Sequence, residues 1–204
     1  MMKISVFFIV FIIASISCMK SPPAGLVFPN SANLNDNFKV HWTYTNETIT
    51  FKIEVNANGW VSFGFSPNGG MYNSDLMMAW TAPNGTVMFK DIHFKESGKI
   101  YSDKIQNWKR LDYVQSNGTT SVTFERRIKI CKANRLMDEI NIDAEMTQYV
   151  IYAWGDNYAG EWPTYHGRNR GSKNLPLLGS LNKKINLDMS QIDTFEFSVN
   201  VRTF

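Results

Sequence analysis

The sequence predicts an all-β protein in which two antiparallel sheets pack face to face as a sandwich. Short apolar segments recur along the 204 residues, and clusters of Asn, Gly, Pro and Ser separate them. Several of these segments alternate apolar and polar residues, which is the pattern of a strand with one buried face. No segment has a persuasive helical repeat of apolar residues. Short strands at this spacing favour two packed sheets.

Five strands are expected in the first half of the chain. They are residues 38–42, 50–55, 60–65, 76–80 and 86–89. Asn58-Gly59 precedes the third of them, and Pro83-Asn84-Gly85 precedes the fifth. Both segments are typical of tight turns between paired strands, and the second is a strong indication of a hairpin.

The second half of the chain is less regular. Residues 121–124 are an expected strand after the turn Asn117-Gly118, and residues 149–154 form a continuous apolar run that suits a strand covered on both faces. Residues 134–146 have poor periodicity and predict a loop with at most one helical turn. Residues 155–170 are polar, Gly-rich and aromatic, and a loop of this length is often functional.

The basic residues do not indicate a nucleic-acid-binding protein. The formal net charge is +3, and the Lys and Arg residues are scattered. The densest basic stretch is Arg126, Arg127, Lys129 and Lys132. Because these residues alternate with apolar ones, we expect them on the solvent face of a strand rather than in a phosphate-binding patch. No nucleic-acid partner is therefore expected.

Residues 1–18 have the pattern of a secretory signal peptide. Lys3 precedes an uncharged and largely apolar run at residues 4–16, and small residues follow it. The run is shorter than the about 20 apolar residues that a transmembrane helix needs. The sequence therefore predicts a secreted, extracellular protein without a stable membrane span.

Three sequons agree with export. Asn46, Asn84 and Asn117 each begin an Asn-X-Thr tripeptide. All three fall in segments that we expect to be turns, where a glycan has room. The sequence therefore predicts a glycoprotein.

Three separated blocks of the sequence carry a family resemblance. They are residues 59–71 with 74–76, residues 149–154, and residues 165–175. These blocks resemble the DOMON domain, and within that family the N-terminal domain of the dopamine β-hydroxylase-like monooxygenases. The resemblance is closer to the monooxygenase X branch than to dopamine β-hydroxylase itself. It covers about residues 33–180 and implies an immunoglobulin-like β-sandwich, in agreement with the strand pattern.

The resemblance also divides the chain into a signal peptide at residues 1–18, a DOMON domain at 19–180 and a tail at 181–204. The tail resembles the lead into a copper catalytic domain, which follows in full-length family members. The histidines of this chain are His41, His93 and His166. Because such copper centres need several imidazole or thioether ligands, no copper site is expected in this chain.

The two cysteines are Cys18 and Cys131. If Cys18 leaves with the signal peptide, Cys131 has no partner within the chain. Two interpretations stay open, namely an intermolecular disulfide through Cys131 and a buried, inert thiol. The family ties a cysteine at this position to the catalytic chain, so the resemblance also implies an unpaired Cys131 here.

The resemblance implies a metal site, expected to hold calcium. Asp75 lies where a turn enters an apolar strand, and the other implied ligands are the carbonyl oxygens of Leu76 and Ile92 and the side chain of Asn107. Asn107 stands where the family has Asp, so the site keeps an oxygen ligand and loses a charge, which weakens calcium binding. The alternative is that Asp75 hydrogen-bonds the turn backbone.

Met71 and His166 form a second implied ligand pair. In the haem-binding branch of the DOMON family, one Met and one His ligate the iron of haem b from opposite sides, an axial pair that suits a low-spin cytochrome. Met71 lies in a Gly-rich turn, and His166 lies in the long polar loop. The alternative is that Met71 packs against its neighbours and that His166 forms a hydrogen bond beside Tyr165.

The leading interpretation is a secreted ligand-binding or interaction module that is not catalytic alone and whose small ligand or protein partner is unidentified. No nucleophile and base are arranged for catalysis. The acidic residues Asp138, Glu139, Asp143 and Glu145 have the pattern of a solvated loop face. Two alternatives stay open. They are a truncated chain of a copper- and ascorbate-dependent monooxygenase, and a haem electron-transfer domain.

We predict that the chain, expressed in a secretory host, loses its N-terminal segment near Cys18 and carries glycans at the sequons. Mass spectrometry should find a new N-terminus close to Met19, and glycosidase treatment should lower the apparent mass. A triple Asn→Gln variant at Asn46, Asn84 and Asn117 should not respond to glycosidase. An intact Met1 together with no glycosidase response would contradict the prediction.

Overall fold

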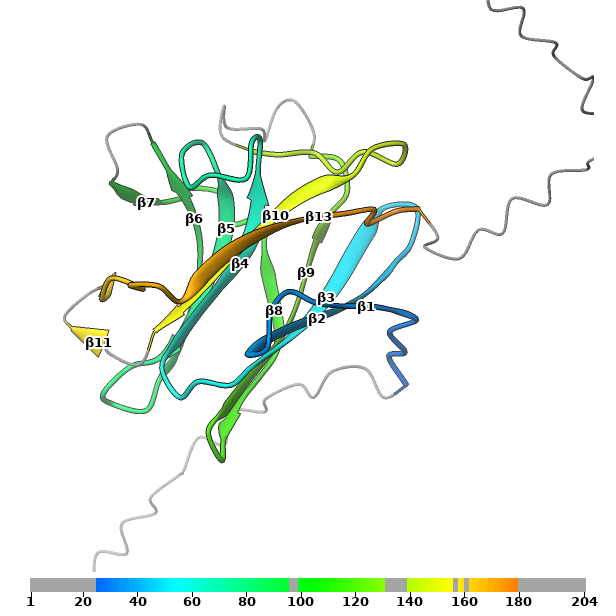
Figure 1. Cartoon of the computed structure of the whole chain (residues 1–204). Helices are drawn as coiled ribbons and strands as arrows, with labels where there is room; N and C mark the ends of the chain where they lie inside the picture. The colour runs from blue at the N-terminus through cyan, green and yellow to red at the C-terminus, as the bar shows by residue number, and fades with distance from the viewer. Residues whose placement is uncertain (1–24, 96–98, 131–138, 156–157, 160–161, 180–204) are drawn as a thin grey trace, which may run out of the picture.

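The computed structural model describes residues 25–95, 99–130, 139–155, 158–159 and 162–179 (Figure 1). Within these ranges the chain consists of strands and their connections, so no helix there is long and apolar enough to cross a membrane. The strands are β1 (Asn30–Asn33), β2 (Phe38–Tyr44), β3 (Thr48–Val55), β4 (Trp60–Ser66), β5 (Asp75–Thr81), β6 (Val87–Phe94), β7 (Ile100–Ser102), β8 (Lys109–Ser116), β9 (Thr119–Arg127), β10 (Gln148–Gly155), β11 (Tyr158–Ala159), β12 (Trp162–Pro163) and β13 (Arg170–Leu175).

The strands form two main sheets that pack as a sandwich (Figure 1). One sheet has five strands in the order β1-β2-β3-β9-β8, and the other has six in the order β13-β10-β4-β5-β6-β7. Strands β11 and β12 form a separate small ribbon. Every neighbouring pair is antiparallel. The predicted all-β sandwich is therefore confirmed.

Each strand expected from the apolar pattern is present, and the strands that the pattern missed include every edge of the two main sheets. The missed edge strands are β1 and β8 in one sheet and β7 and β13 in the other. Their side chains are mostly exposed or half-buried and polar. An edge strand needs only one neighbour and little apolar surface, so backbone pairing defines it and side-chain alternation does not.

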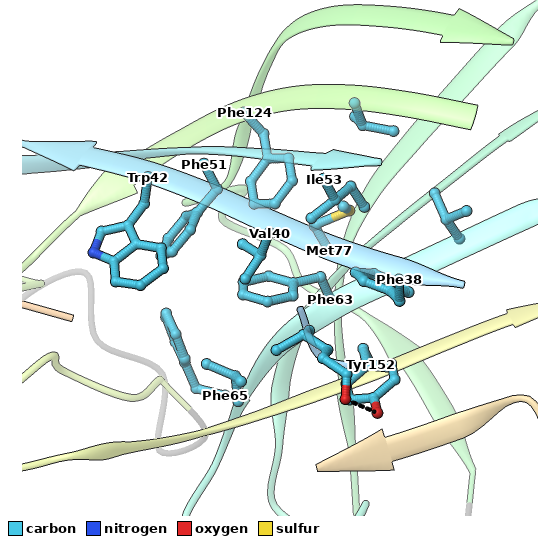
Figure 2. Close-up of a cluster of buried hydrophobic side chains, with 14 of the residues drawn as sticks. Phe38, Val40, Trp42, Phe51, Ile53, Phe63, Phe65, Met77, Phe124 and Tyr152 are labelled. Atoms are coloured by element: carbon cyan, nitrogen blue, oxygen red, sulfur yellow. Dashed lines mark hydrogen bonds between the residues drawn. The ribbon is translucent and has the colours of Figure 1, made fainter. Parts of the chain in front are cut away.

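Aromatic side chains from both sheets fill the space between them (Figure 2). Phe51 of β3 lies 5.1 Å from Phe63 of β4 and 5.7 Å from Phe124 of β9, measured between ring centroids. All three rings are fully buried. Because β4 alternates, Phe63 points into this core while Trp60 points to the opposite face of the six-stranded sheet.

The opposite, outer face of the six-stranded sheet carries a second apolar cluster. Its buried members are Trp60, Leu76, Met78, Trp80, Ile92, Phe94 and Ile151. Strands β4, β5 and β10 are thus buried on both faces. This confirms the prediction that residues 149–154 form a strand covered on both sides. The outer face of the sheet is therefore apolar and largely shielded from solvent over these strands.

All three sequon asparagines lie exposed in turns between strands, as predicted. Asn46 connects β2 to β3, and Asn84 connects β5 to β6. Asn117 and Gly118 form a two-residue hairpin between β8 and β9, with φ of 51° and 82°. Positive φ at both positions is what the right-handed twist of a two-residue hairpin requires. Cys18 and Cys131 lie outside the described residues.

A buried ion pair joins the two sheets. Arg126 on β9 of one sheet donates from Nη1 to Asp75 Oδ2 on β5 of the other over 2.6 Å, and both side chains are almost completely buried. Trp108 Nε1 donates to Asp75 Oδ1 over 2.6 Å, and Arg126 Nη2 donates to the Ile140 carbonyl over 2.7 Å. We call these contacts the inter-sheet ion pair.

The inter-sheet ion pair corrects one expectation from the sequence. Arg126 does not lie on the solvent face. Its side chain points inward in phase with Phe124 and Ile128, whereas Arg127 and Lys129 are exposed as predicted. Burial therefore alternates from Arg126 to Ile130, and Arg126 takes the inward face instead of the predicted solvent face, while Lys132 lies outside the described residues. A guanidinium tolerates this position because the Asp75 carboxylate and the Ile140 carbonyl accept hydrogen bonds from it.

We predict that Asp75→Ala lowers the free energy of unfolding by about 3–5 kcal/mol, because it leaves the Arg126 guanidinium buried without its partner. Urea denaturation measures the loss. The double variant Asp75→Leu, Arg126→Met should be more stable than Asp75→Ala, since neither charge remains.

The matched control is Lys109→Met, which removes an exposed ion pair of 2.9 Å with Glu125. An exposed pair contributes about 1 kcal/mol or less. If Asp75→Ala costs no more than Lys109→Met, the inter-sheet ion pair does not hold the sandwich together.

Candidate functional site

A cavity of about 480 Å³ opens on the outer face of the six-stranded sheet. Its floor comes from strands β4, β5 and β10, and its rim comes from the β4–β5 loop, the end of β6 and the loop before β13. No Asp or Glu is among its described lining residues. We call it the outer-face cavity.

Small side chains in one row of the sheet make the floor hollow. Ala153 of β10 pairs with Ser62 of β4, and Ser62 pairs with Met78 of β5. Side chains in register point to the same face, so two short side chains lie next to each other in this row. Ser62 Oγ donates to the Met77 carbonyl over 2.9 Å, which satisfies the hydroxyl and leaves the floor apolar. Larger neighbours such as Ile151 rise beside the hollow.

Trp60 forms one wall, and a glycine makes room for it. A Cβ on Gly155 would lie 2.4 Å from Trp60 Nε1, so the cross-strand neighbour of this indole must be glycine. The indole nitrogen is buried and has no hydrogen-bond partner among the described residues. The His166 ring lies beside the indole with 6.5 Å between centroids. Wall and rim thus present aromatic surface to the cavity.

His166 is held in one tautomer. Its Nδ1 lies 3.0 Å from the Gly167 carbonyl oxygen, and because a carbonyl only accepts, Nδ1 carries the proton. The lone pair of Nε2 is then available to a ligand. Burial lowers the pKa of His166, and the nearby positive charge of Arg170 lowers it further. The ring is therefore neutral at physiological pH, as a metal-ligating imidazole must be.

Met71 belongs to the lining of the same cavity as His166. The loop that carries it is fixed by local hydrogen bonds, with Ser66 Oγ donating to the Gly70 carbonyl and Ser74 Oγ donating to the Met71 carbonyl, each over 2.5 Å. Gly69 adopts φ of 82° in this loop. Met71 is 37% exposed, so it is both a lining residue and accessible to solvent.

A second candidate site lies on the inner side of the same sheet. Asp91, Asp103 and Glu139 are all buried, and each can offer a carboxylate oxygen within 4.8 Å of the others. Asp91 Oδ2 accepts hydrogen bonds from the backbone nitrogens of Asn107 and Trp108 over 2.6 and 3.3 Å. We call these three carboxylates the acidic cluster.

Two oxygens of the acidic cluster have no hydrogen-bond partner among the residues that the structure describes. They are Asp91 Oδ1 and Glu139 Oε2, and both are buried. Glu139 Oε2 lies 3.9 Å from Arg126 Nη2, while Glu139 Oε1 accepts from the Asn107 side-chain amide. Asp103 Oδ1 is bound by His93 Nδ1. Buried polar atoms are rarely left without a partner, so these two oxygens indicate a missing positively charged or protonic partner.

The charge balance of the acidic cluster points the same way. Burial, and then the charge of Asp75, raise the pKa of Asp91 to about 9. Burial is also the main reason why the pKa of Glu139 rises to about 7 and why the pKa of Asp103 lies above its ordinary value. Within the described residues, one guanidinium and one imidazole face four carboxylates here, so that part of the chain supplies less positive than negative charge to the cluster.

The residues predicted to bind calcium lie beside the acidic cluster. Leu76 and Ile92 are register partners on β5 and β6. The Asp75 carboxylate is occupied by the inter-sheet ion pair and by the backbone N–H of Ile140, which donates to Oδ2 over 3.1 Å. Asn107 contributes its backbone N–H to Asp91 and its amide to Glu139.

Sequence reasoning missed the three acids that the structure gathers. Glu139 was expected on a solvated loop face and is instead 3% exposed, whereas Asp143 and Glu145 are exposed as expected. Asp91 could have been found from its position. It is two residues from Phe89 and therefore shares the inward face of β6, where a charged side chain is unusual.

The three histidines lie in different settings. His41 Nε2 contacts Glu54 Oε2 over 3.1 Å on β2 and β3, His93 contacts Asp103, and His166 lines the outer-face cavity. In the described part of the chain, no two of them belong to a common group of metal-ligating side chains.

Comparisons with known proteins agree with this architecture. The profile of the DOMON domain matches residues 34–155. DBH-like monooxygenase protein 1 of Mus musculus is 34% identical over 158 residues, which are 76% of this chain and 25% of that protein. The Homo sapiens protein of the same name is 32% identical over 159 residues, with the same shares.

Among solved structures, the cytochrome domain of Myriococcum thermophilum cellobiose dehydrogenase superposes with a TM-score of 0.57 at 14% identity. The match covers 76% of this chain and 85% of that one. This similarity shows a shared fold. The chain spans about a quarter of the length of the DBH-like relatives that it matches. From the matched profile and the sandwich itself, the chain belongs to the DOMON domain family and is related to the DBH-like monooxygenase proteins.

Proposed function

We propose that this domain binds a small ligand in the outer-face cavity, and that b-type haem is the ligand its lining fits best. One observation carries the proposal. Met71 and His166, far apart in the sequence, line the same apolar cavity. A thioether and a neutral imidazole are an established axial pair for low-spin haem iron. The named cytochrome domain has the same fold, and the donor set of this chain is the reason for choosing haem.

The cavity also suits a flat, apolar molecule. Its volume of about 480 Å³ falls within the usual range for small-molecule sites. Trp60, Leu76 and Ile151 supply apolar surface that excludes water from the bound molecule. The Gly167 carbonyl orients His166 so that Nε2 is the ligating atom. Bound haem would supply one-electron redox chemistry, and these residues would hold it.

The wider role that we propose is a secreted, glycosylated binding module with no hydroxylase activity of its own. Asn46, Asn84 and Asn117 are exposed, and none of them is among the residues that line the cavity. The monooxygenase chemistry in the names of these relatives belongs to proteins about four times as long as the matched region. A copper- and ascorbate-dependent monooxygenase that contains this domain is the alternative setting for the same module.

A second proposal is that the acidic cluster binds one calcium ion. The two buried carboxylate oxygens without hydrogen bonds favour it, because a hard cation with oxygen ligands would satisfy both. Asp91, Asp103 and Glu139 supply the charge. Of the ligands predicted from the sequence, Ile92 follows Asp91 on β6 and Asn107 lies in the same loop as Asp103, while Asp75 and Leu76 lie on the neighbouring strand β5 and the Asp75 carboxylate is occupied by Arg126.

We predict that the purified chain binds added haemin with a Soret band and, when reduced, the sharp visible bands of a low-spin haem. His166→Ala and Met71→Ala should each weaken binding by about tenfold or more, because each removes one axial ligand. Absorption titration measures the affinity. His41→Ala removes a histidine from the other sheet and should leave binding unchanged. Equal affinities for wild type and His166→Ala would rule out ligation by His166.

We predict that calcium raises the melting temperature of chain purified in a chelator. A ligand that binds only the native state stabilises it by about 2.7 kcal/mol at 100 times its Kd. Asp91→Asn should abolish the response, since it removes a charge while keeping the shape. Asp143→Asn, at an exposed acid near the cluster in sequence, should keep it. A wild-type melting curve that calcium does not move would contradict calcium binding.

A further inference from the structure

Arg170 lies at the mouth of the outer-face cavity, on the side of β13. It is the first residue of that strand and pairs with Ala153 of β10. Ala153 in turn pairs with Ser62, so Arg170 continues the row of small residues that forms the cavity floor. Residues in one row share a face of the sheet, and Arg170 is accordingly part of the cavity lining.

The positive charge of Arg170 is not neutralised by the described part of the protein. Its guanidinium donates from Nη1 to the Tyr165 hydroxyl oxygen over 2.9 Å, and no described carboxylate forms an ion pair with it. By contrast, Arg126 is paired with Asp75. The charge of Arg170 lies at the cavity, because Arg170 is one of its lining residues.

Tyr165 adds a second donor at the same place. Its hydroxyl oxygen accepts from Arg170, which leaves its own proton to donate outward. The side chain is 75% exposed, and its ring lies 4.4 Å from the His166 ring, measured between centroids. A planar guanidinium beside a phenol offers several N–H and O–H donors to one group that only accepts.

From this geometry we propose that Arg170 and Tyr165 form a carboxylate-binding subsite at the mouth of the outer-face cavity, so that the ligand is an apolar molecule that carries a carboxylate. This inference rests on the proposed function, since it concerns a ligand of the same cavity. The apolar body lies over Leu76, Met78 and Ile151, and the carboxylate lies at the opening. A protonated amine is disfavoured because the described lining offers it Arg170 and no acid.

Two sources of such a carboxylate are distinguishable. One is a propionate of a tetrapyrrole, and the other is a free fatty or aromatic acid. Haemin and its dimethyl ester form the first pair of probes, and cis-parinaric acid and its methyl ester form the second. Within each pair the apolar body is nearly constant and only the negative charge is lost. Binding is measured by absorption for the first pair and by fluorescence for the second.

The wild-type chain should bind the acid of at least one pair about tenfold more tightly than its ester, the effect of one charge-assisted contact. Arg170→Gln should remove this difference by weakening the acid and not the ester. Arg170→Lys should keep part of it, because the charge remains and the planar fork is lost. Tyr165→Phe should reduce the difference about threefold. Arg168→Gln removes an exposed cation of the same loop that does not line the cavity, and should change nothing.

The outcomes distinguish failure of the carboxylate subsite from failure of ligand binding by the cavity. If only the haemin pair shows the difference, the carboxylate is a tetrapyrrole propionate. If only the fatty-acid pair shows it, the subsite stands and recognises a free acid rather than a haem propionate, whether or not haemin itself binds. If acid and ester bind equally, and Arg170→Gln affects neither, the subsite is refuted while ligand binding by the cavity stands. If no probe binds, both the cavity's function and the subsite are refuted. Unchanged melting of Arg170→Gln shows that the variant is folded.

Discussion

The inter-sheet ion pair between Arg126 and Asp75 is the interaction on which the packing of β9 against β5 and the surroundings of the acidic cluster depend. Each charge is almost fully buried, so neither could remain without the other. The pair fixes β9 against β5 and positions Trp108, whose indole both donates to Asp75 and lies 4.7 Å below the guanidinium. It also explains the acidic cluster. Arg126 is committed to Asp75 at 2.6 Å and reaches Glu139 only at 3.9 Å, so the remaining carboxylates must obtain protons or a cation from elsewhere.

The six-stranded sheet can carry a ligand site because both of its faces are apolar. Between the sheets, rings such as Phe51 and Phe63 make a dense core that holds β4 in place (Figure 2). On the outer face, short side chains at Ser62 and Ala153 leave a hollow that neighbouring large side chains cannot fill. Loops at both ends of these strands then close the rim. The inner face of this sheet thus belongs to the core, and its outer face lines the site. Loop residues such as Met71 and His166 lie at the edge of a cavity whose floor is a well-packed sheet.

The sequence predicted those parts of the fold in which side-chain chemistry alternates with burial. The strands that contain Phe51, Phe63 and Phe124 could be located because one face of each is buried. The four edge strands could not, because their side chains are polar and only backbone pairing defines them. Arg126 shows a different limit. The alternation of a strand determines which residues share a face. It does not say which face is buried when one face carries both a charged residue, Arg126, and an apolar one, Ile128. Glu139 depends on contacts with distant strands, which no local pattern contains.

The two candidate sites meet at β5. Because a strand alternates, Asp75 and Met77 point between the sheets, towards the acidic cluster and the core, while Leu76 and Met78 point outward into the cavity. Asp75 and Leu76 are joined by one peptide bond, so a displacement of β5 moves the support of both sites together. A cation held by Asp91, Asp103 and Glu139 would lower the negative charge that faces Asp75, and a flat ligand would lie against Leu76, so the two would affect neighbouring residues of β5 from opposite faces. Their binding free energies would then be linked, with equal effects in both directions.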